Sequence, residues 1–175
     1  MNIRSGFLLF STFFFLSTML TAHIAIAAEN NRQYDIRKIR WGMSMEEVAL
    51  SEKEGATYAN KLENQLLYTT QLFDSDCIIA YDFNGNKKIF QASYIIQNLN
   101  KDKKDKIFET LNQKFREKYE EALPEGGYND PINALLLKMH REFFNDRTAI
   151  TITQIKDNVV VSYTEISEYK RAQKK

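Results

Sequence analysis

Cysteine and histidine are scarce in this chain of 175 residues. Cys77 is the only cysteine, so no disulfide can form within the chain. A zinc site needs three or four cysteine, histidine or carboxylate ligands. A nucleophile–base pair needs a base beside a serine or cysteine, and nothing local marks His140, the only histidine after residue 28, as one. We therefore predict no catalytic, cofactor-binding or metal-binding residues, and we interpret His140 as a surface or interface side chain.

An excess of charge of either sign is also missing. The chain has 24 basic and 23 acidic residues. Its first 28 residues contain Arg4 and no acid, so removing them leaves 23 of each. Nucleic-acid binding requires a basic surface that neutralises phosphates, and membrane-surface binding is favoured by a polybasic segment beside an amphipathic helix. The sequence has neither feature, so nucleic acid is not an expected partner.

Long apolar runs are absent after residue 28, but one lies before it. An apolar run from Phe7 to about Leu20 follows Arg4 and precedes the small-residue segment Ala25-Ile26-Ala27-Ala28. This pattern is typical of a secretory signal peptide. The alternative is an uncleaved membrane anchor, but the run of about 14 residues is shorter than the ~20 that a spanning helix needs. We expect residues 1–28 to be the signal and residues 29–175 to be one periplasmic or secreted domain without a transmembrane segment or lipid anchor.

The first predicted helix has a clear start. Ser44 and Glu47 have the spacing of a capping box, in which each side chain accepts a hydrogen bond from the other residue's backbone. A helix is therefore predicted over 45–54, with Gly55 ending it. The flanking segments are interpreted as a short extended stretch over 36–41 and a polar connection over 56–64.

Three strands are predicted next, over 65–73, 77–83 and 89–96. Turn residues separate them at 74–76 and at Asn84-Gly85-Asn86-Lys87, which is a hairpin signal. The order indicates an antiparallel meander. Its alternation places Tyr81 and Phe83 on the same face as Phe90 and Tyr94.

A second helix is predicted over 103–122, because apolar residues recur there at helical spacing. The segment 132–144 is apolar and is compatible either with a helix or with a loop that leads into a strand at about 139–144. Strict alternation predicts strands over 148–155 and 159–164, and the charged tail 168–175 is expected to be frayed. The predicted fold is α+β: a tandem α-β-β-β arrangement whose antiparallel sheet has both helices on one face.

The opening segment from Ile36 to Val48 contains Trp41-Gly42-Met43-Ser44-Met45-Glu46-Glu47-Val48. It resembles the start of small exported bacterial proteins with a W-G-M-S-x-E-E-V motif, and the Gly-Met-Ser step is similar to outer-membrane assembly lipoproteins of the Smp/Oml type. The helix–meander order resembles the β-lactamase-inhibitor-protein-like fold. The resemblance covers about 13 residues. It implies that fold and a non-enzymatic, protein-binding tendency, although this chain lacks a lipidation cysteine and paired disulfides.

Two single residues have two interpretations each. Cys77 lies in an alternating apolar segment, which predicts a buried, unreactive thiol; the alternative is a free thiol that forms a mixed disulfide. Trp41, the only tryptophan, is either a core anchor or a binding residue.

The sheet face turned away from the helices is the candidate binding surface. It is expected to be polar and partly apolar, a mixture that suits an interface because interface centres are depleted in charge. The alternative is a plain solvated face. The apolar members are Ile78, Ile89, Ile95 and Val160, beside Asp82. The predicted partner-binding residues are Gln91, Ser93, Thr151, Thr153, Ser162 and Thr164.

These features favour an exported, non-catalytic binding module that engages a protein or a cell-envelope component. The richness in aromatic residues supports a second hypothesis, a carrier of a small apolar ligand with a pocket between helices and sheet. A third is a carboxylate-based hydrolase, since 23 acids are available, although no pair stands out.

Overall fold

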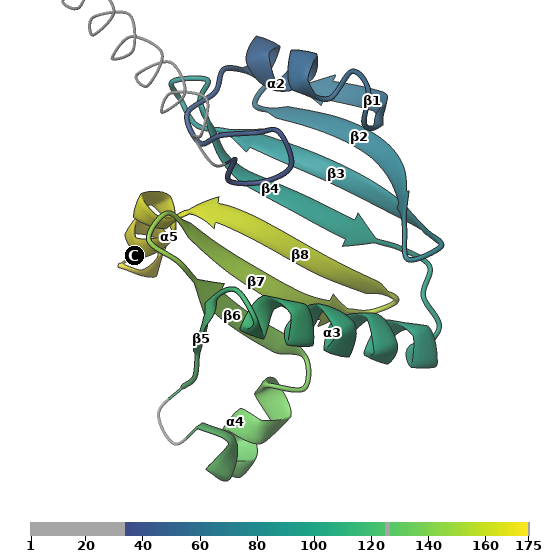
Figure 1. Ribbon diagram of the computed structural model, residues 1–175, viewed down its shortest axis with the longest axis vertical. Coiled ribbons are helices and arrows are strands. Elements are labelled where there is room, and N and C mark those ends of the chain that lie inside the picture. The colour runs from purple at the N-terminus through teal and green to yellow at the C-terminus, as the bar shows by residue number, and fades with distance from the viewer. Residues whose placement is uncertain (1–33, 125–126, 175) are drawn as a thin grey trace, which may run out of the picture. The chain divides into compact units, whose positions relative to one another are not determined.

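The computed structural model describes residues 34–124 and 127–174, so the predicted signal peptide lies outside the described residues. An open, antiparallel sheet of eight strands in the order β1-β2-β3-β4-β8-β7-β6-β5 forms the centre of the fold (Figure 1). The α+β class with an antiparallel sheet is therefore as predicted. The strands are β1 (Thr57–Leu62), β2 (Gln65–Leu72), β3 (Ser75–Phe83), β4 (Ile89–Ile96), β5 (Glu120–Ala122), β6 (His140–Phe144), β7 (Thr148–Ile155) and β8 (Asn158–Glu165). The helices are α2 (Met45–Ser51), α3 (Lys101–Arg116), α4 (Pro131–Leu136) and α5 (Ile166–Gln173), with a short 3₁₀ helix η1 (Gly127–Asn129).

Four strands, rather than the expected three, follow each of α2 and α3. The polar connection predicted over 56–64 contains β1, an edge strand whose six residues are all exposed. Because neither face of β1 is buried, its sequence has no alternation to reveal it. The helix predicted to reach Ala122 ends at Arg116, and Glu120–Ala122 form β5 by pairing with β6.

The start of α2 is as predicted, whereas α3 begins two residues before the predicted start at 103. The capping box is confirmed: Ser44 Oγ accepts a hydrogen bond from the Glu47 backbone N–H, and Glu47 Oε2 accepts one from the Ser44 N–H. Helix α2 ends at Ser51, three residues before the predicted end. Helix α3 begins after Asn100, whose side chain accepts from the Lys103 N–H.

Two hydrophobic clusters pack on the sheet face that bears Tyr81 and Tyr163. The first contains Met45 and Val48 of α2, together with side chains of β2, β3 and β4. The second contains Ile107, Phe108 and Phe115 of α3, together with side chains of β6, β7 and β8. Tyr94 and Tyr163 pack against both clusters, with their rings 6.2 Å apart in an edge-to-face contact. This aromatic pair links the two clusters into a continuous packed layer.

A β-bulge changes the predicted face of two residues. Asp82 pairs with Gln91 and Phe83 pairs with Ile89, which leaves Phe90 as an extra residue in β4. Ile89, expected on the polar face, is therefore buried in the first cluster. Phe90, expected among the core residues, lines a cleft on the opposite face instead.

Both interpretations of the segment 132–144 are realised in succession, because α4 is followed by strand β6. The tail predicted to be frayed is helix α5. Its Tyr169 ring packs edge-to-face on Phe144, with the ring centroids 5.3 Å apart. This tertiary contact has no counterpart in the charged local sequence, which explains the error.

The structure also places Cys77 and Trp41, the two residues that had two interpretations each. Cys77 is buried on β3, as predicted, and burial raises the pKa of its thiol to about 11. Trp41 packs partly buried against the first cluster, and its Nε1–H donates to Thr148 Oγ1 at 3.0 Å. Trp41 thereby connects the segment before α2 to strand β7.

Candidate functional site

The six predicted partner-binding residues lie on three neighbouring strands. Gln91 and Ser93 of β4 pair with Thr164 and Ser162 of β8, and Thr151 of β7 pairs with Ser162 from the other side. Thr153 follows Thr151 on the same face. The structure therefore brings all six into one patch on the face opposite the two core clusters.

The centre of this patch is an internal hydrogen-bond pair. Ser93 Oγ and Ser162 Oγ lie 2.9 Å apart, and Gln91 Nε2 donates to Ser93 Oγ at 3.4 Å. Ser93 is 7% exposed, so its hydroxyl is satisfied by protein rather than by bulk water. Ser93 therefore supports its neighbours, and we do not expect it to contact a partner directly.

Helix α5 lies over part of the patch, so the face is less open than expected. A cleft of about 430 Å³ lies between α5 and the sheet. Gln91, Thr151, Ser162 and Thr164 line it from the sheet, whereas Ser93 and Thr153 do not. The remaining lining residues are Phe90 from β4 and Glu168, Tyr169, Arg171 and Ala172 from α5. The turn of the chain into α5 directly after β8 converts a flat face into a cleft.

A chain of polar contacts holds α5 against the sheet. Tyr169 Oη donates to Glu142 Oε2 at 2.8 Å, and Glu142 Oε1 lies 3.0 Å from His140 Nε2. His140 Nδ1 is in turn 2.8 Å from Thr153 Oγ1. The hydrogen bond from His140, helped by that from Tyr169, lowers the pKa of Glu142 despite its partial burial. Thr153 and His140 therefore anchor the wall of the cleft.

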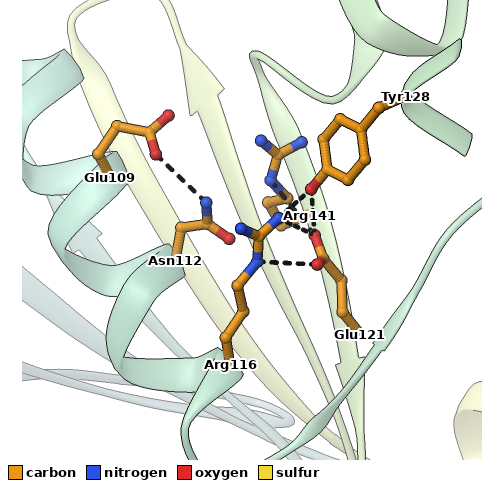
Figure 2. A network of polar contacts seen from close by, with 6 residues as sticks. All are labelled: Glu109, Asn112, Arg116, Glu121, Tyr128 and Arg141. Carbon is orange, nitrogen blue, oxygen red and sulfur yellow. Dashed lines mark hydrogen bonds and ion pairs between the residues drawn. The ribbon is translucent and has the colours of Figure 1, made fainter.

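A second polar network, on the core-side face, was missed by sequence reasoning (Figure 2). Glu121 of β5 accepts two hydrogen bonds from the Arg116 guanidinium, at 2.8 and 3.1 Å. Glu121 also accepts one from Tyr128 Oη at 2.9 Å and lies 3.6 Å from Arg141 Nε. Arg116 contacts the Tyr128 hydroxyl as well.

Arg141 is the buried member of this network. It is 6% exposed, and its guanidinium lies 5.7 Å from the Phe108 ring centre and 5.4 Å from that of Tyr128. Such cation–π contacts favour a partly desolvated cation. The alternation of β6 was an available signal, because Arg141 shares the inward face with Phe143. The network joins α3, β5, η1 and β6, and so fixes the base of the segment that carries α4.

Neither network forms a metal centre. Among residues 34–124 and 127–174, no three histidine, cysteine or acidic side chains are grouped so that they could hold an ion. In the same part of the chain, no helix combines the length and apolar character that crossing a membrane requires.

Comparisons of the chain with protein-family models, with curated proteins and with solved structures found no match.

Proposed function

We propose that this protein is an exported, non-catalytic binding module that engages a protein or another cell-envelope component through the cleft between α5 and the sheet. The proposal places it in the periplasm or outside the cell. One observation carries it: Gln91, Thr151, Ser162 and Thr164, selected from sequence alternation alone, line a single cleft. A plain solvated sheet face would have no such wall.

The chemistry of the cleft supports an uncharged polar group as the bound element. Its floor offers hydroxyl and amide groups, which both donate and accept hydrogen bonds. The two charged lining residues, Glu168 and Arg171, belong to α5 and form an ion pair with each other. The sheet side of the cleft therefore carries no charge, in keeping with the depletion of charge at interface centres.

Rigidity of the floor also supports a binding role. The Ser93–Ser162 hydrogen bond and the continuous pairing of β4, β8 and β7 hold the lining side chains in place. Preorganised groups lose little entropy on binding. The volume of about 430 Å³ is that of a pocket for a short chain segment or a small polar group.

The test is affinity capture from a cell-envelope extract with the double variant Thr151→Arg, Thr164→Arg, whose long side chains would fill the cleft. The matched control is Thr57→Arg, Thr69→Arg, which places the same charges on exposed positions of β1 and β2. We expect the cleft variant to lose a specific partner that the wild type and the control retain. Identical partner profiles for folded proteins would refute the cleft assignment.

The apolar-ligand carrier gains no comparable support. The space between α3 and the sheet is occupied by packed side chains, including Phe108, Phe115 and Tyr163. Phe115 contacts the Tyr163 ring with centroids 6.1 Å apart. A ligand of useful size would have to displace this aromatic packing.

We also propose that the fold is a tandem repeat of one helix and one antiparallel meander, related to the β-lactamase-inhibitor-protein-like group. The strand order supports this, since the last strand of each meander, β4 or β8, pairs with the other at the sheet centre. Tyr94 and Tyr163 support it too, since each is the sixth residue of its eight-residue strand.

A further inference from the structure

Exposed apolar side chains gather in the segment 123–139, between β5 and β6. Six of the eleven large apolar side chains that are exposed in the described residues belong to it. They are Leu123, Tyr128, Ile132, Leu135, Leu136 and Met139. Isolated exposed apolar residues are ordinary, whereas a contiguous group marks an interaction surface.

Three of these side chains share one face of α4, and a fourth lies in the turn that follows; these four are the stripe. Ile132, Leu135 and Leu136 are spaced i, i+3 and i+4, which is the pattern of a helix face that packs against another element, and Met139 lies three residues after the end of the helix. Ile132 is 71% exposed and Leu135 is 61% exposed. No residue of α4 is buried, and Figure 1 shows α4 set beyond the β5–β6 end of the sheet. Within the described residues, the stripe is therefore an unpartnered apolar face.

The stripe is held in a fixed position. Asp130 Oδ1 accepts the backbone N–H groups of Ile132 and Asn133, and Pro131 occupies the first turn. Tyr128, just before the helix, is tied to Glu121 and stacks beside Arg141 (Figure 2). A partner would therefore meet a preorganised surface.

We infer that this stripe is a self-association surface, covered by the α4 stripe of a second copy of the chain in a two-fold, antiparallel arrangement. In a two-fold interface the same patch faces itself, so any charge at its centre would be opposed by its own copy. Helix α4 has no charged residue and avoids this repulsion. The inference does not depend on the cleft at α5.

Charge at the two ends of the stripe is complementary in that arrangement. Asp130 stands at the start of α4, and Lys138 lies just beyond its end. Antiparallel packing places Asp130 of each copy beside Lys138 of the other, which gives two such charge pairs in the dimer. A parallel arrangement would instead place like charges together.

The size of the patch also suits a second copy. From their exposed fractions, the four side chains of the stripe present roughly 450 Å² per copy, against the ≈800 Å² that each partner contributes to a standard interface. The stripe therefore supplies about half of the area of a modest dimer, and its polar border can supply the rest.

The test is sedimentation velocity over a wide concentration range. The protein is produced with its own N-terminal segment, so that any natural removal of residues 1–28 takes place in the cell. We expect a two-chain species that dissociates on dilution. The variant Leu135→Glu, Leu136→Glu should raise the dissociation constant at least about 100-fold. Leu50→Glu is the matched control, because Leu50 of α2 is exposed to the same 61% as Leu135, and it should leave the constant unchanged.

The end charges test the antiparallel arrangement. Lys138→Glu should raise the dissociation constant roughly tenfold, because it faces Asp130 of the other copy. Adding Asp130→Asn, which keeps a capping side chain, should reverse about half of that loss, because it removes the new repulsion without restoring the attraction. The inference is overturned if the chain remains a monomer at every concentration. This holds whether the stripe then binds phospholipid vesicles, is covered by residues 1–33 or faces solvent. A dimer that survives the Leu135 and Leu136 substitutions overturns it as well.

Discussion

Ser93 Oγ and Ser162 Oγ are joined by a 2.9 Å hydrogen bond, and each serine is the fifth residue of an eight-residue strand. Strands β4 and β8 pair symmetrically about these two residues: Ala92 faces Tyr163, and Tyr94 faces Val161. The bond thus marks the local two-fold axis on which the two meanders meet, and Ser162 is itself one of the residues that line the proposed binding cleft.

Replacing one of the two serines should lower the free energy of unfolding by more than half of the loss that replacing both causes. Ser93→Ala leaves the hydroxyl of Ser162 without this partner, so we expect a loss of about 1 kcal/mol in the free energy of unfolding. The double variant should show a coupling energy of about 0.5–1.5 kcal/mol in a double-mutant cycle measured by urea unfolding. The exposed residue Ser167 provides the control substitution to alanine. Strict additivity of the two losses would show that the bond contributes nothing.

Gly55→Ala should destabilise the protein through an ion pair rather than through its own backbone. A Cβ at Gly55 would lie 2.3 Å from Arg37 Nη2, which is 3.0 Å from the carboxylate of Glu52. Glu52 is 1% exposed and also accepts a 2.6 Å hydrogen bond from Tyr81. Displacing the cation leaves a buried carboxylate without its counter-charge, which we expect to cost about 1–3 kcal/mol.

Gly85→Ala is the matched control for Gly55→Ala. Apart from Gly85 itself and its two chain neighbours, no residue has an atom within 4 Å of a Cβ at this position, so the free energy of unfolding should change by less than about 0.5 kcal/mol. In an Arg37→Gln background, Gly55→Ala should lose most of its effect, because the displaced cation is already gone. An undiminished loss in that background would point to a cause other than the ion pair.

Acid should release α5 from the sheet. The pKa of Glu142 is lowered in the folded protein by hydrogen bonds from His140 and Tyr169. Its stabilising contribution is therefore complete above the ordinary glutamate pKa of about 4.3 and is lost as the pH falls through the lower folded value. The protection factors of the α5 amides, which correct the exchange rates for the intrinsic effect of pH, should fall in that acid range, and Glu142→Gln should remove this part of the pH dependence.

Asp82 provides a control of opposite sign. Burial raises the pKa of Asp82, so the folded state takes up its proton more readily and gains stability from it as the pH falls. Asp82→Asn should therefore make acid destabilisation steeper, whereas Glu142→Gln should make it shallower. The same change of slope in both variants would contradict the assigned cause.

Cys77 should resist thiol reagents while the protein is folded. Its side chain is 1% exposed, and its pKa of about 11 leaves on the order of 0.1% thiolate at pH 8. Mass spectrometry after maleimide treatment should show no adduct in native buffer and one adduct in urea. Thr57→Cys, on exposed strand β1, should gain a single adduct under native conditions. Rapid native labelling of the wild type would show that β3 opens locally.

The residues of the polar face show which structural features the alternation of polar and apolar residues can predict. Thr151, Ser162 and Thr164 were assigned to the correct face, because a period of two residues is a local property of a paired strand. Phe90 and Ile89 were exchanged, because the bulge opposite Asp82 and Phe83 depends on how β3 and β4 pair. Arg141 was overlooked, since its cation is accommodated by rings from α3 and η1 that are distant in sequence.

The sequence by itself determined the α+β class, the capping box of Ser44 and Glu47, and the alternating strands at the sheet centre, because each depends on residues within one or two turns of each other. Only the tertiary structure decided that the charged tail forms α5 and encloses a cleft, that exposed β1 is a strand, and that the apolar stripe of α4 faces outward. Those outcomes depend on contacts between distant segments, such as Tyr169 with Glu142, whose energies no local pattern records.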